Sequence, residues 1–467
     1  MDSSEQRWRA FPSRIAKHLP AAPYRHCLGR LAAMFRENHP AVEVIRHFWR
    51  HPKAWRYQVQ IVRLFVLNGV TRCHWKRLCY ERETGVFPPT FIVLSPTNRC
   101  NLACTGCYAN SAAQADELTW GEANSVVAQA RELGMPFIAI SGGEPFMWPG
   151  LLDLVEQNSD IMFLIYTNGT LITPANARRM ARSANVAPAL SVEGGREETD
   201  GRRGNGVYAA LERAFACLRE AGTLYGFSTT VTRQNFDAVC NDRFRAQQVE
   251  RGCAFGWLFQ YAPVGRGVDL DLMTTPEQRI ALQRRVAEWR RRRGIFIVDF
   301  WSDGPMVGGC IAGGRRYLHV NARGDIEPCT FLKHTTHNIR AHTLHEAITS
   351  PFFTAIRERQ EHHPNLLRPC FLVDYPEEWQ DLVNTHGAYS TDGASTAVLA
   401  QHRAALAERS QRFAALADPV WESLDRRTLW TSEHWPSIQR CVDQAKTAVA
   451  QSHAPCPRAR AACAAGQ

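Results

Sequence analysis

From residue 91 onward, short apolar segments alternate with longer segments in which apolar residues recur every three or four positions. The short segments are typical of buried strands, and the longer ones of amphipathic helices. Strands are expected at 91–94, 137–140, 162–166, 187–192, 225–231 and 254–260. Helices are expected near 119–133, 173–184, 207–221, 236–250 and 276–293. Six strands, each followed by a helix, favour parallel pairing and predict an α/β domain with a barrel-like sheet.

The pattern differs on either side of this repeat. Before it, short basic helices carry interleaved aromatic residues, and after it, Ala-rich helices lead to a tail without periodicity. At 467 residues the chain exceeds the ~250–300 residues that one core usually supports, so two or three parts are expected. We expect a helical N-terminal region, a barrel, a small third domain, a helical C-terminal region and a disordered tail, at 1–90, 91–300, 301–375, 376–445 and 446–467 respectively.

The net positive charge of the chain comes from its first 80 residues. The chain has a net charge of +10, and residues 1–80 hold fifteen basic and four acidic side chains. One interpretation is that these helices pack on the barrel and the arginines form a solvated surface. The other is peripheral attachment to an anionic membrane, which basic amphipathic helices rich in aromatic residues favour. Nucleic acid is the weaker interpretation, because no recognisable reader module accompanies the charge.

The apolar residues predict neither a membrane span nor secretion. No run of about 18 apolar residues occurs, and the N-terminus lacks a signal-peptide pattern. We therefore expect a cytoplasmic protein, with the basic region as its only contact with a membrane. In a reducing compartment, the fifteen cysteines indicate metal binding rather than disulfides.

Three cysteines stand close together directly after the first expected strand, in the sequence LSPTNRCNLACTGCYAN of residues 94–110. Cys100, Cys104 and Cys107 can bind three irons of a four-iron, four-sulfur (4Fe-4S) cluster and leave the fourth iron without a protein ligand. A structural zinc site needs a fourth ligand, and no Cys or His stands at a matching offset. An odd local number of cysteines also disfavours a disulfide.

This C-x3-C-x2-C motif, on a loop after a first barrel strand, resembles that of the radical SAM superfamily. The resemblance implies a partial (β/α)6 barrel, a catalytic 4Fe-4S cluster on the three cysteines and S-adenosylmethionine on the open iron. One electron would then split S-adenosylmethionine into methionine and a 5'-deoxyadenosyl radical. Many members have an aromatic residue before the third cysteine, where this chain has Gly106. Either Tyr108 or a backbone group would then contact the adenine.

Residues at later strand ends extend the resemblance. The segment Ser141-Gly142-Gly143-Glu144-Pro145 is similar to the one that holds the methionine amino group in this family. Ser191 and Glu193 resemble its ribose contact. Arg203, in an expected loop at 202–204 after the fourth strand, is the candidate partner of the methionine carboxylate, because an arginine fork matches a carboxylate in two places. Arg202 is the alternative.

A second set of cysteines follows the barrel. Cys310 and Cys329 flank an expected hairpin over 317–327, and Cys370 comes later. This arrangement resembles the auxiliary-cluster domain of SPASM and twitch radical SAM enzymes, and implies a second 4Fe-4S cluster with three cysteine ligands. Its fourth iron is then free for substrate or capped by a residue such as Asp374. The alternative is three separate buried thiols, since free cysteine is often a small core residue.

The resemblance implies an enzyme that cleaves S-adenosylmethionine and removes a hydrogen atom from an unreactive C–H bond of a peptide, lipid or other small molecule. It also implies an electron donor such as flavodoxin or ferredoxin. Relatives with the second cysteine domain often modify peptides, whereas a lipid substrate would account for the basic N-terminal region. The alternative function is an iron-sulfur redox sensor without turnover, and residues 141–145 argue against it.

Overall fold

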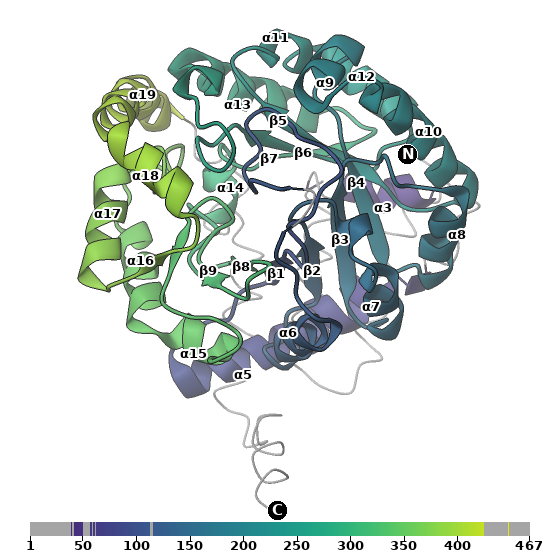
Figure 1. The fold of residues 1–467 in the computed structure, drawn as a ribbon, viewed down its shortest axis with the longest axis horizontal. Helices are drawn as coiled ribbons and strands as arrows, with labels where there is room; N and C mark the ends of the chain where they lie inside the picture. The colour runs from purple at the N-terminus through teal and green to yellow at the C-terminus, as the bar shows by residue number, and fades with distance from the viewer. Residues whose placement is uncertain are drawn as a thin grey trace, which may run out of the picture.

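The computed structural model describes residues 39, 42–49, 57, 59–60, 62–112, 115–424 and 447. Helices surround one twisted sheet, and the view in Figure 1 looks along the axis of this ring. The sheet has the strand order β7-β6-β5-β4-β3-β2-β1-β8-β9. Its strands are β1 (Phe91–Leu94), β2 (Phe137–Ile140), β3 (Met162–Thr167), β4 (Val186–Ser191), β5 (Gly226–Val231), β6 (Phe255–Gln260), β7 (Phe296–Asp299), β8 (Tyr317–Val320) and β9 (Ile326–Glu327).

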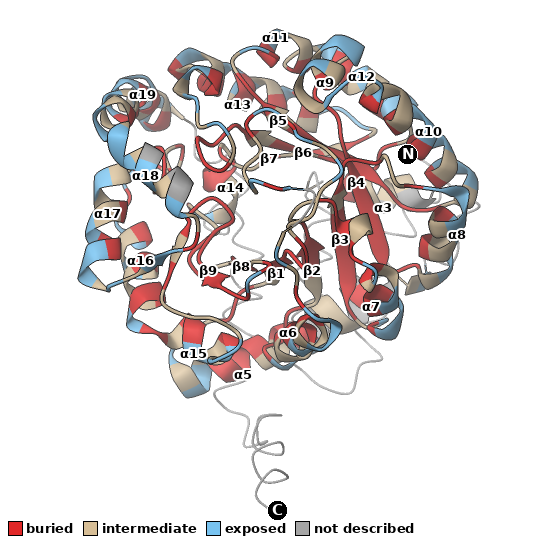
Figure 2. Cartoon of the chain, viewed as in Figure 1, coloured by how far each residue is buried: buried red, intermediate tan, exposed pale blue. Residues whose placement is uncertain are grey.

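The first seven strands are parallel to their neighbours, as the alternation of strand and helix predicts. All six expected strands are present within two residues of their predicted ends, which confirms the α/β class and the partial barrel. Strand β4 is buried along its whole length, and Figure 2 shows buried residues concentrated on the strands. Because parallel strands carry helices on one face and barrel interior on the other, most of them are largely apolar, whereas β5 carries Ser228, Thr229 and Thr230.

Helices α6 to α13 cover the outside of the barrel. They are α6 (Trp120–Glu132), α7 (Leu151–Gln157), α8 (Pro174–Ser183), α9 (Arg196–Arg203), α10 (Val207–Ala221), α11 (Phe236–Val239), α12 (Asp242–Glu250) and α13 (Pro276–Arg290). Capping boxes fix the starts of three of them, with Thr119, Thr173 and Thr275 as N-caps. The single helix expected over 236–250 is instead two helices, because the Asn241 side chain caps a new one by accepting from Phe244 N.

The structure corrects one loop. Arg202 and Arg203 form the last turn of α9, not a loop after β4. This helix has no apolar face long enough to be recognised by periodicity. Glu197 and Glu198 in its first turn and the two arginines in its last turn complement the helix dipole instead.

The expected hairpin is present, and it extends the barrel sheet. Strands β8 and β9 pair antiparallel, and β8 also pairs in parallel with β1. The sheet therefore continues across residue 300, where we expect the barrel to end. Strand β1 has neighbours on both sides, and the loop that follows it lies between the barrel and the hairpin.

The described part of the N-terminal region packs beneath the amino ends of the strands. It comprises α3 (Val42–Trp49), the π-helix η2 (Val62–Cys73) and α5 (His74–Thr84). Tyr57 Oη donates to Val186 O at 2.9 Å at the start of β4, and Asn68 Nδ2 donates to Asp160 O at 2.7 Å just before β3. Arg46 pairs with Glu43. These contacts match the interpretation in which the region packs on the barrel. The predicted helices before residue 39 lie outside the described residues.

The C-terminal part completes the ring beside the hairpin. It contains α14 (Gly304–Val307), α15 (Leu344–Thr349), α16 (Pro351–Glu361), α17 (Pro376–Thr385), α18 (Gly393–Gln401), α19 (Arg403–Ser423) and a small pair of strands, β10 (His334–Thr335) and β11 (Tyr389–Ser390). Among the described residues, no helix is both long and apolar enough to cross a membrane. The predicted disordered tail lies outside the described residues.

Candidate functional site

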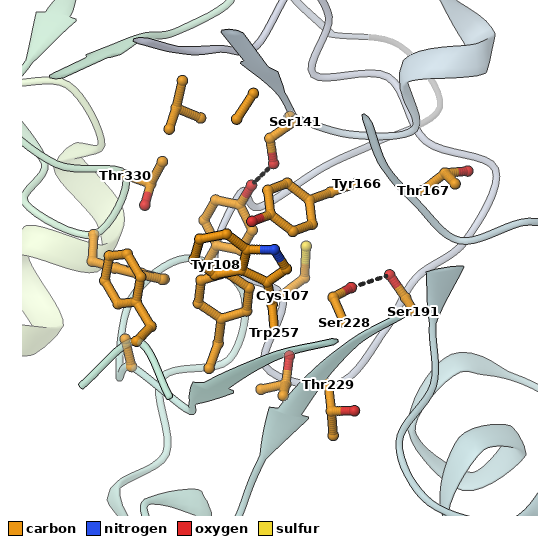
Figure 3. Close-up of a pocket in the computed structure, with 18 of the residues that line it drawn as sticks. Cys107, Tyr108, Ser141, Tyr166, Thr167, Ser191, Ser228, Thr229, Trp257 and Thr330 are labelled. Carbon is orange, nitrogen blue, oxygen red and sulfur yellow. Dashed lines mark hydrogen bonds between the residues drawn. The ribbon is translucent and has the colours of Figure 1, made fainter. Parts of the chain in front are cut away.

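A pocket opens at the carboxyl ends of the barrel strands, where an α/β barrel normally carries its chemistry. It holds about 1280 Å³ of space free of protein atoms, part of it open to solvent. Figure 3 shows the side chains of Tyr108, Tyr166 and Trp257 converging in it. Of the sequence-predicted residues, the lining includes Cys100, Cys104, Cys107, Tyr108, Gly142, Gly143, Ser191 and Arg203. Glu144 and Glu193 are not part of this lining and lie behind it.

All three cysteines of the first set line this pocket from one loop. Each has a hydrogen-bond donor or hydroxyl near its sulfur: Leu102 N lies 3.4 Å from Cys100 Sγ, Arg203 Nη1 lies 4.0 Å from Cys104 Sγ, and Ser111 Oγ lies 3.9 Å from Cys107 Sγ. Burial raises the pKa of Cys100 to about 11. A bound metal ion would favour the thiolate form of such a thiol.

The glycine segment after β2 packs against the cysteine loop. Gly143 N donates to Thr97 O at 2.9 Å, and Glu144 N donates to Arg99 O at 2.7 Å. A Cβ atom at Gly143 would lie 1.9 Å from Arg99 O, and Gly142 has φ of +111°. Close contact with the loop backbone therefore requires glycine at both positions. Their exposed backbone still borders the pocket.

Glu144 holds the turn after β3 rather than facing the pocket. It is fully buried, and its carboxylate accepts from Thr167 Oγ1 at 2.7 Å and from Asn168 N at 2.7 Å. Burial raises the pKa of this carboxyl. Asn168 Nδ2 in turn lies 3.9 Å from Cys100 Sγ. Glu144 thus connects the turn after β3 to the first cysteine.

Glu193 holds two arginines at the pocket wall. The side chain is fully buried, and Oε1 accepts from Arg202 Nη1 at 2.7 Å and from Arg203 Nε at 2.7 Å. The other oxygen accepts from Thr230 N at 3.0 Å. Burial opposes ionisation of this carboxyl, but the two guanidinium groups outweigh it and hold its pKa below the ordinary value. Because its side chain is fully buried and does not line the pocket, Glu193 acts here by positioning the two arginines.

The strand ends opposite Ser191 supply hydroxyls that the sequence patterns did not single out. Ser191 Oγ lies 3.3 Å from Ser228 Oγ on β5 (Figure 3). Ser228, Thr229 and Thr230 all border the pocket. The signal for them was their position at the end of an expected strand, since Ser and Thr within strands are otherwise unremarkable.

Gly106 leaves room for an aromatic ring from elsewhere in the chain. A Cβ atom at this position would lie 2.6 Å from Cε2 of Tyr261, which follows β6. Tyr108, on the other side of Cys107, hydrogen-bonds to Ser141, and its ring meets Phe331 edge-on at 5.5 Å. Tyr261 thus contacts the position where family members often carry an aromatic side chain. Sequence alone could not reveal this, because the two residues are far apart in the chain.

The second set of cysteines comes together behind the pocket. Cys329 is buried and Cys310 and Cys370 are partly buried. Burial raises the pKa of all three thiols, that of Cys310 to about 12, and each of the other two thiols adds to the effect at Cys370. Tyr317, which lines the pocket, lies with its hydroxyl 2.9 Å from Cys329 Sγ.

Asp374 lies beside the second set but is already paired. Its carboxylate is bound in two places by Arg279, at 2.7 and 3.3 Å, and also accepts from Cys370 N at 3.1 Å. These bonds hold Cys370 in place. They occupy the oxygens that a capping ligand would use.

A buried chain of polar side chains joins the hairpin to the start of the cysteine loop. Ser95 Oγ lies 2.8 Å from His319 Nε2, and His319 Nδ1 lies 2.5 Å from Glu327 Oε2. Burial lowers the pKa of His319 more than Glu327 raises it. All three are buried, so they fix the relative position of the two cysteine-bearing regions and do not form an accessible nucleophile.

Comparisons with known proteins agree with this geometry. The profile of the radical SAM superfamily matches residues 94–240. Mycofactocin maturase MftC of Mycolicibacterium smegmatis is 30% identical over 275 residues, which span 55% of this chain and 68% of that protein. The chain belongs to the radical SAM superfamily. An AdoMet-dependent heme synthase of Methanosarcina barkeri is 27% identical over 319 residues, spanning 62% of this chain and 89% of the synthase.

The fold of this radical SAM protein also resembles solved structures. Streptococcus suis SuiB bound to S-adenosylmethionine has a TM-score of 0.53 at 18% identity, over 63% of this chain and 75% of SuiB. The relatives are enzymes, and so is this chain. Membership of the family implies S-adenosylmethionine and a 4Fe-4S cluster as cofactors.

The pocket residues fit such a cluster. Three thiols on one loop, with N–H donors near two of their sulfurs, are the donor set that a 4Fe-4S cluster with one open iron requires. No three His, Cys, Asp or Glu side chains among the described residues are arranged to hold a single metal ion.

Proposed function

We propose that this radical SAM enzyme binds its 4Fe-4S cluster through Cys100, Cys104 and Cys107 and cleaves S-adenosylmethionine at the carboxyl ends of the barrel strands. The observation that carries the proposal is that these three cysteines line one pocket with a guanidinium, glycine backbone and strand-end hydroxyls. When bound, the cluster supplies one electron to S-adenosylmethionine, and the resulting 5'-deoxyadenosyl radical takes a hydrogen atom from the substrate.

Three kinds of residue would bind S-adenosylmethionine. Arg203, whose guanidinium reaches Cys104, binds the carboxylate of S-adenosylmethionine. Glu193 orients the Arg203 side chain. The backbone of Gly142 and Gly143 faces the amino group. Ser191 lies where a ribose hydroxyl can be bound.

The adenine contact falls to aromatic residues beside the cysteine loop. Tyr261 occupies the space next to Gly106, and Tyr108 stands on the far side of Cys107. Tyr108 is held in place by Ser141. Both rings line the pocket.

Cys310, Cys329 and Cys370 would bind a second cluster, as in SPASM or twitch enzymes. Their mutual proximity, and the pocket-lining Tyr317 between them and the substrate, support this proposal. A second cluster so close to the pocket can accept an electron from a substrate radical. Residues 301–375 would form its domain, although β8 shares the barrel sheet.

The remaining partners are an electron donor, such as a flavodoxin or ferredoxin, and a substrate with an unreactive C–H bond. Solved SuiB, of the same fold, has been crystallised with its precursor peptide SuiA, and we propose a peptide as substrate. The alternative is a lipid substrate, with contact between the basic N-terminal region, residues 1–80, and an anionic membrane.

The decisive experiment uses full-length protein purified without oxygen and reconstituted with iron and sulfide. Iron is counted per chain, and 5'-deoxyadenosine is measured after addition of S-adenosylmethionine and dithionite. About eight irons per chain together with deoxyadenosine would support both clusters and radical chemistry. Bound iron without deoxyadenosine after long incubation would overturn the proposed function.

A further inference from the structure

The interior of the pocket is walled by aromatic side chains that the protein leaves half-buried. Tyr166 on β3, Trp257 and Phe259 on β6, and Phe300 after β7 all line the pocket and are partly exposed there. Barrel interiors of this kind are normally filled by side chains packed to native density. Four large rings around an open cavity therefore indicate that something else completes the packing.

These rings form an ordered surface. Trp257 and Phe259 are stacked, with ring centroids 5.9 Å apart and an interplanar angle of 8°. Tyr166 meets Phe259 edge-on at 5.6 Å, and Phe300 lies 5.2 Å from Phe259. Aromatic rings attract one another in two geometries, offset-stacked and edge-to-face. A planar ring bound in this space can stack on one of these rings and meet another edge to face.

The charges of the pocket restrict the ligand further. Among the described lining residues, the permanent charges are those of Arg202 and Arg203, and both pair with Glu193. The proposed function uses Arg203 for the carboxylate of S-adenosylmethionine. A ligand with several carboxylates, such as a porphyrin, would therefore bury negative charges without partners, which is costly.

We propose that the substrate enters this pocket as an uncharged aromatic side chain of a peptide, stacked on Trp257 and Phe259. This inference rests on the proposed function, because it places the substrate beside the site of S-adenosylmethionine cleavage. Binding would remove from water the apolar ring area that the pocket now exposes. The substrate would thus complete the core of the barrel.

The test is binding of small probes to the reconstituted, full-length enzyme in the presence of S-adenosylmethionine, measured by equilibrium dialysis. The probes are N-acetyl-tyrosinamide, N-acetyl-tryptophanamide, N-acetyl-leucinamide and coproporphyrin III. We expect either aromatic amide to bind at least about fivefold more tightly than the leucine amide, because each aromatic contact adds roughly 1 kcal/mol. Equal binding of the three amides, or tighter binding of coproporphyrin III, would overturn the inference.

Two variants locate the binding. Trp257→Leu and Phe259→Leu keep the strand apolar and should each remove most of the preference for aromatic amides. Trp120→Leu, at a tryptophan 38% exposed on α6, is the matched control and should keep it. A preference that survives in both pocket variants would also overturn the inference.

Failure of the inference can be told apart from failure of the proposed function. Deoxyadenosine is measured without probe in the same preparations. Wild-type enzyme that forms deoxyadenosine but shows no aromatic preference would refute only the inference. Absence of deoxyadenosine would refute the proposed function, while dialysis still decides whether the pocket selects aromatic groups.

Discussion

The two sets of cysteines are built in different ways. Cys100, Cys104 and Cys107 stand within eight residues of one loop, whereas Cys310, Cys329 and Cys370 come from three segments spread over sixty residues. The first set lines the pocket, and none of the second set is among the lining residues. A ligand set on one loop can be recognised from spacing alone. A set assembled by tertiary packing depends on every element that brings its members together.

The surroundings of the two sets differ in charge as well. Arg203 reaches toward Cys104 at 4.0 Å, and this guanidinium offers a cofactor carboxylate a partner. Beside the second set, Arg279 Nη1 donates to Asp374 Oδ1 at 2.7 Å, and the Arg279 guanidinium lies over the ring of Phe413. Both arginines are paired with a carboxylate. Arg203 binds Glu193 through Nε and Nη2 and keeps Nη1 toward Cys104, whereas Arg279 uses both of its terminal nitrogens on Asp374. This contrast supports the proposal that S-adenosylmethionine binds at the first set.

Removing a cysteine of the first set should have the largest effect. In Cys104→Ala we expect iron to fall by about four per chain and deoxyadenosine formation to fall at least roughly a hundredfold, because the open iron is lost with the cluster. Iron analysis and mass spectrometry measure both. Cys217→Ala, at a half-buried cysteine on α10, is the control and should retain both. Near-normal deoxyadenosine from Cys104→Ala would exclude this loop as the catalytic site.

Removing a cysteine of the second set should separate iron content from cleavage. In Cys370→Ala we expect about four irons to be lost while deoxyadenosine formation stays within roughly threefold of wild type, since the first cluster remains. Circular dichroism checks that the fold is retained, and Cys310→Ser should behave alike. If iron content does not change in either variant, the three residues are separate buried thiols.

The sequence predicted the first site better than the second for a physical reason. Strand and helix periodicity gave the barrel, and placed the Cys100 loop and the Gly142 segment at the same edge of the sheet. It did not show that Glu144 and Glu193 face away from the cavity, because their burial depends on contacts with Thr167 and Arg202. No local pattern could reveal that Tyr261, which follows β6, fills the space beside Gly106 on the cysteine loop.

The α9 helix and the aromatic wall were missed for related reasons. Helix α9 is charged on most of its surface, so its ends are set by charge and capping rather than by an apolar stripe. The wall residues Tyr166, Trp257 and Phe259 occupy ordinary strand positions. Only the structure shows that their side chains meet inside the barrel without closing it.

The two arginines on Glu193 give a prediction of intermediate size. Arg203→Gln should raise the Kd for S-adenosylmethionine by about tenfold or more, because a charge-assisted bond of roughly 1.5–3 kcal/mol is lost. Arg202→Gln should have a smaller effect, since Arg202 points toward Gly106 O at 3.4 Å. Equilibrium dialysis with the reconstituted proteins measures both constants. A larger effect at Arg202 would reverse the assignment and make it the carboxylate partner.

The smallest expected effect concerns the link between the two sites. Tyr317 is stacked on Phe91 at 5.2 Å, and its hydroxyl lies 2.9 Å from Cys329 Sγ. Hydrogen bonds to ligand sulfurs stabilise the reduced, more negative state of a cluster. Tyr317→Phe should therefore leave iron content unchanged and make the reduction potential of the second cluster more negative, as measured by electron paramagnetic resonance during redox titration.

The Tyr317 variant also shows whether the two clusters are distinct. The first cluster should keep its potential in Tyr317→Phe, because this hydroxyl bonds to Cys329 and to no cysteine of the first set among the contacts described. Deoxyadenosine formation should change little for the same reason. A matched variant, Tyr389→Phe, removes an exposed hydroxyl that bonds to Asp325 instead and should shift neither potential. If Tyr317→Phe changes the reduction potential of the first cluster only, the Tyr317 hydroxyl acts on the catalytic pocket. The proposal that it bonds to a ligand of the second cluster would then be wrong.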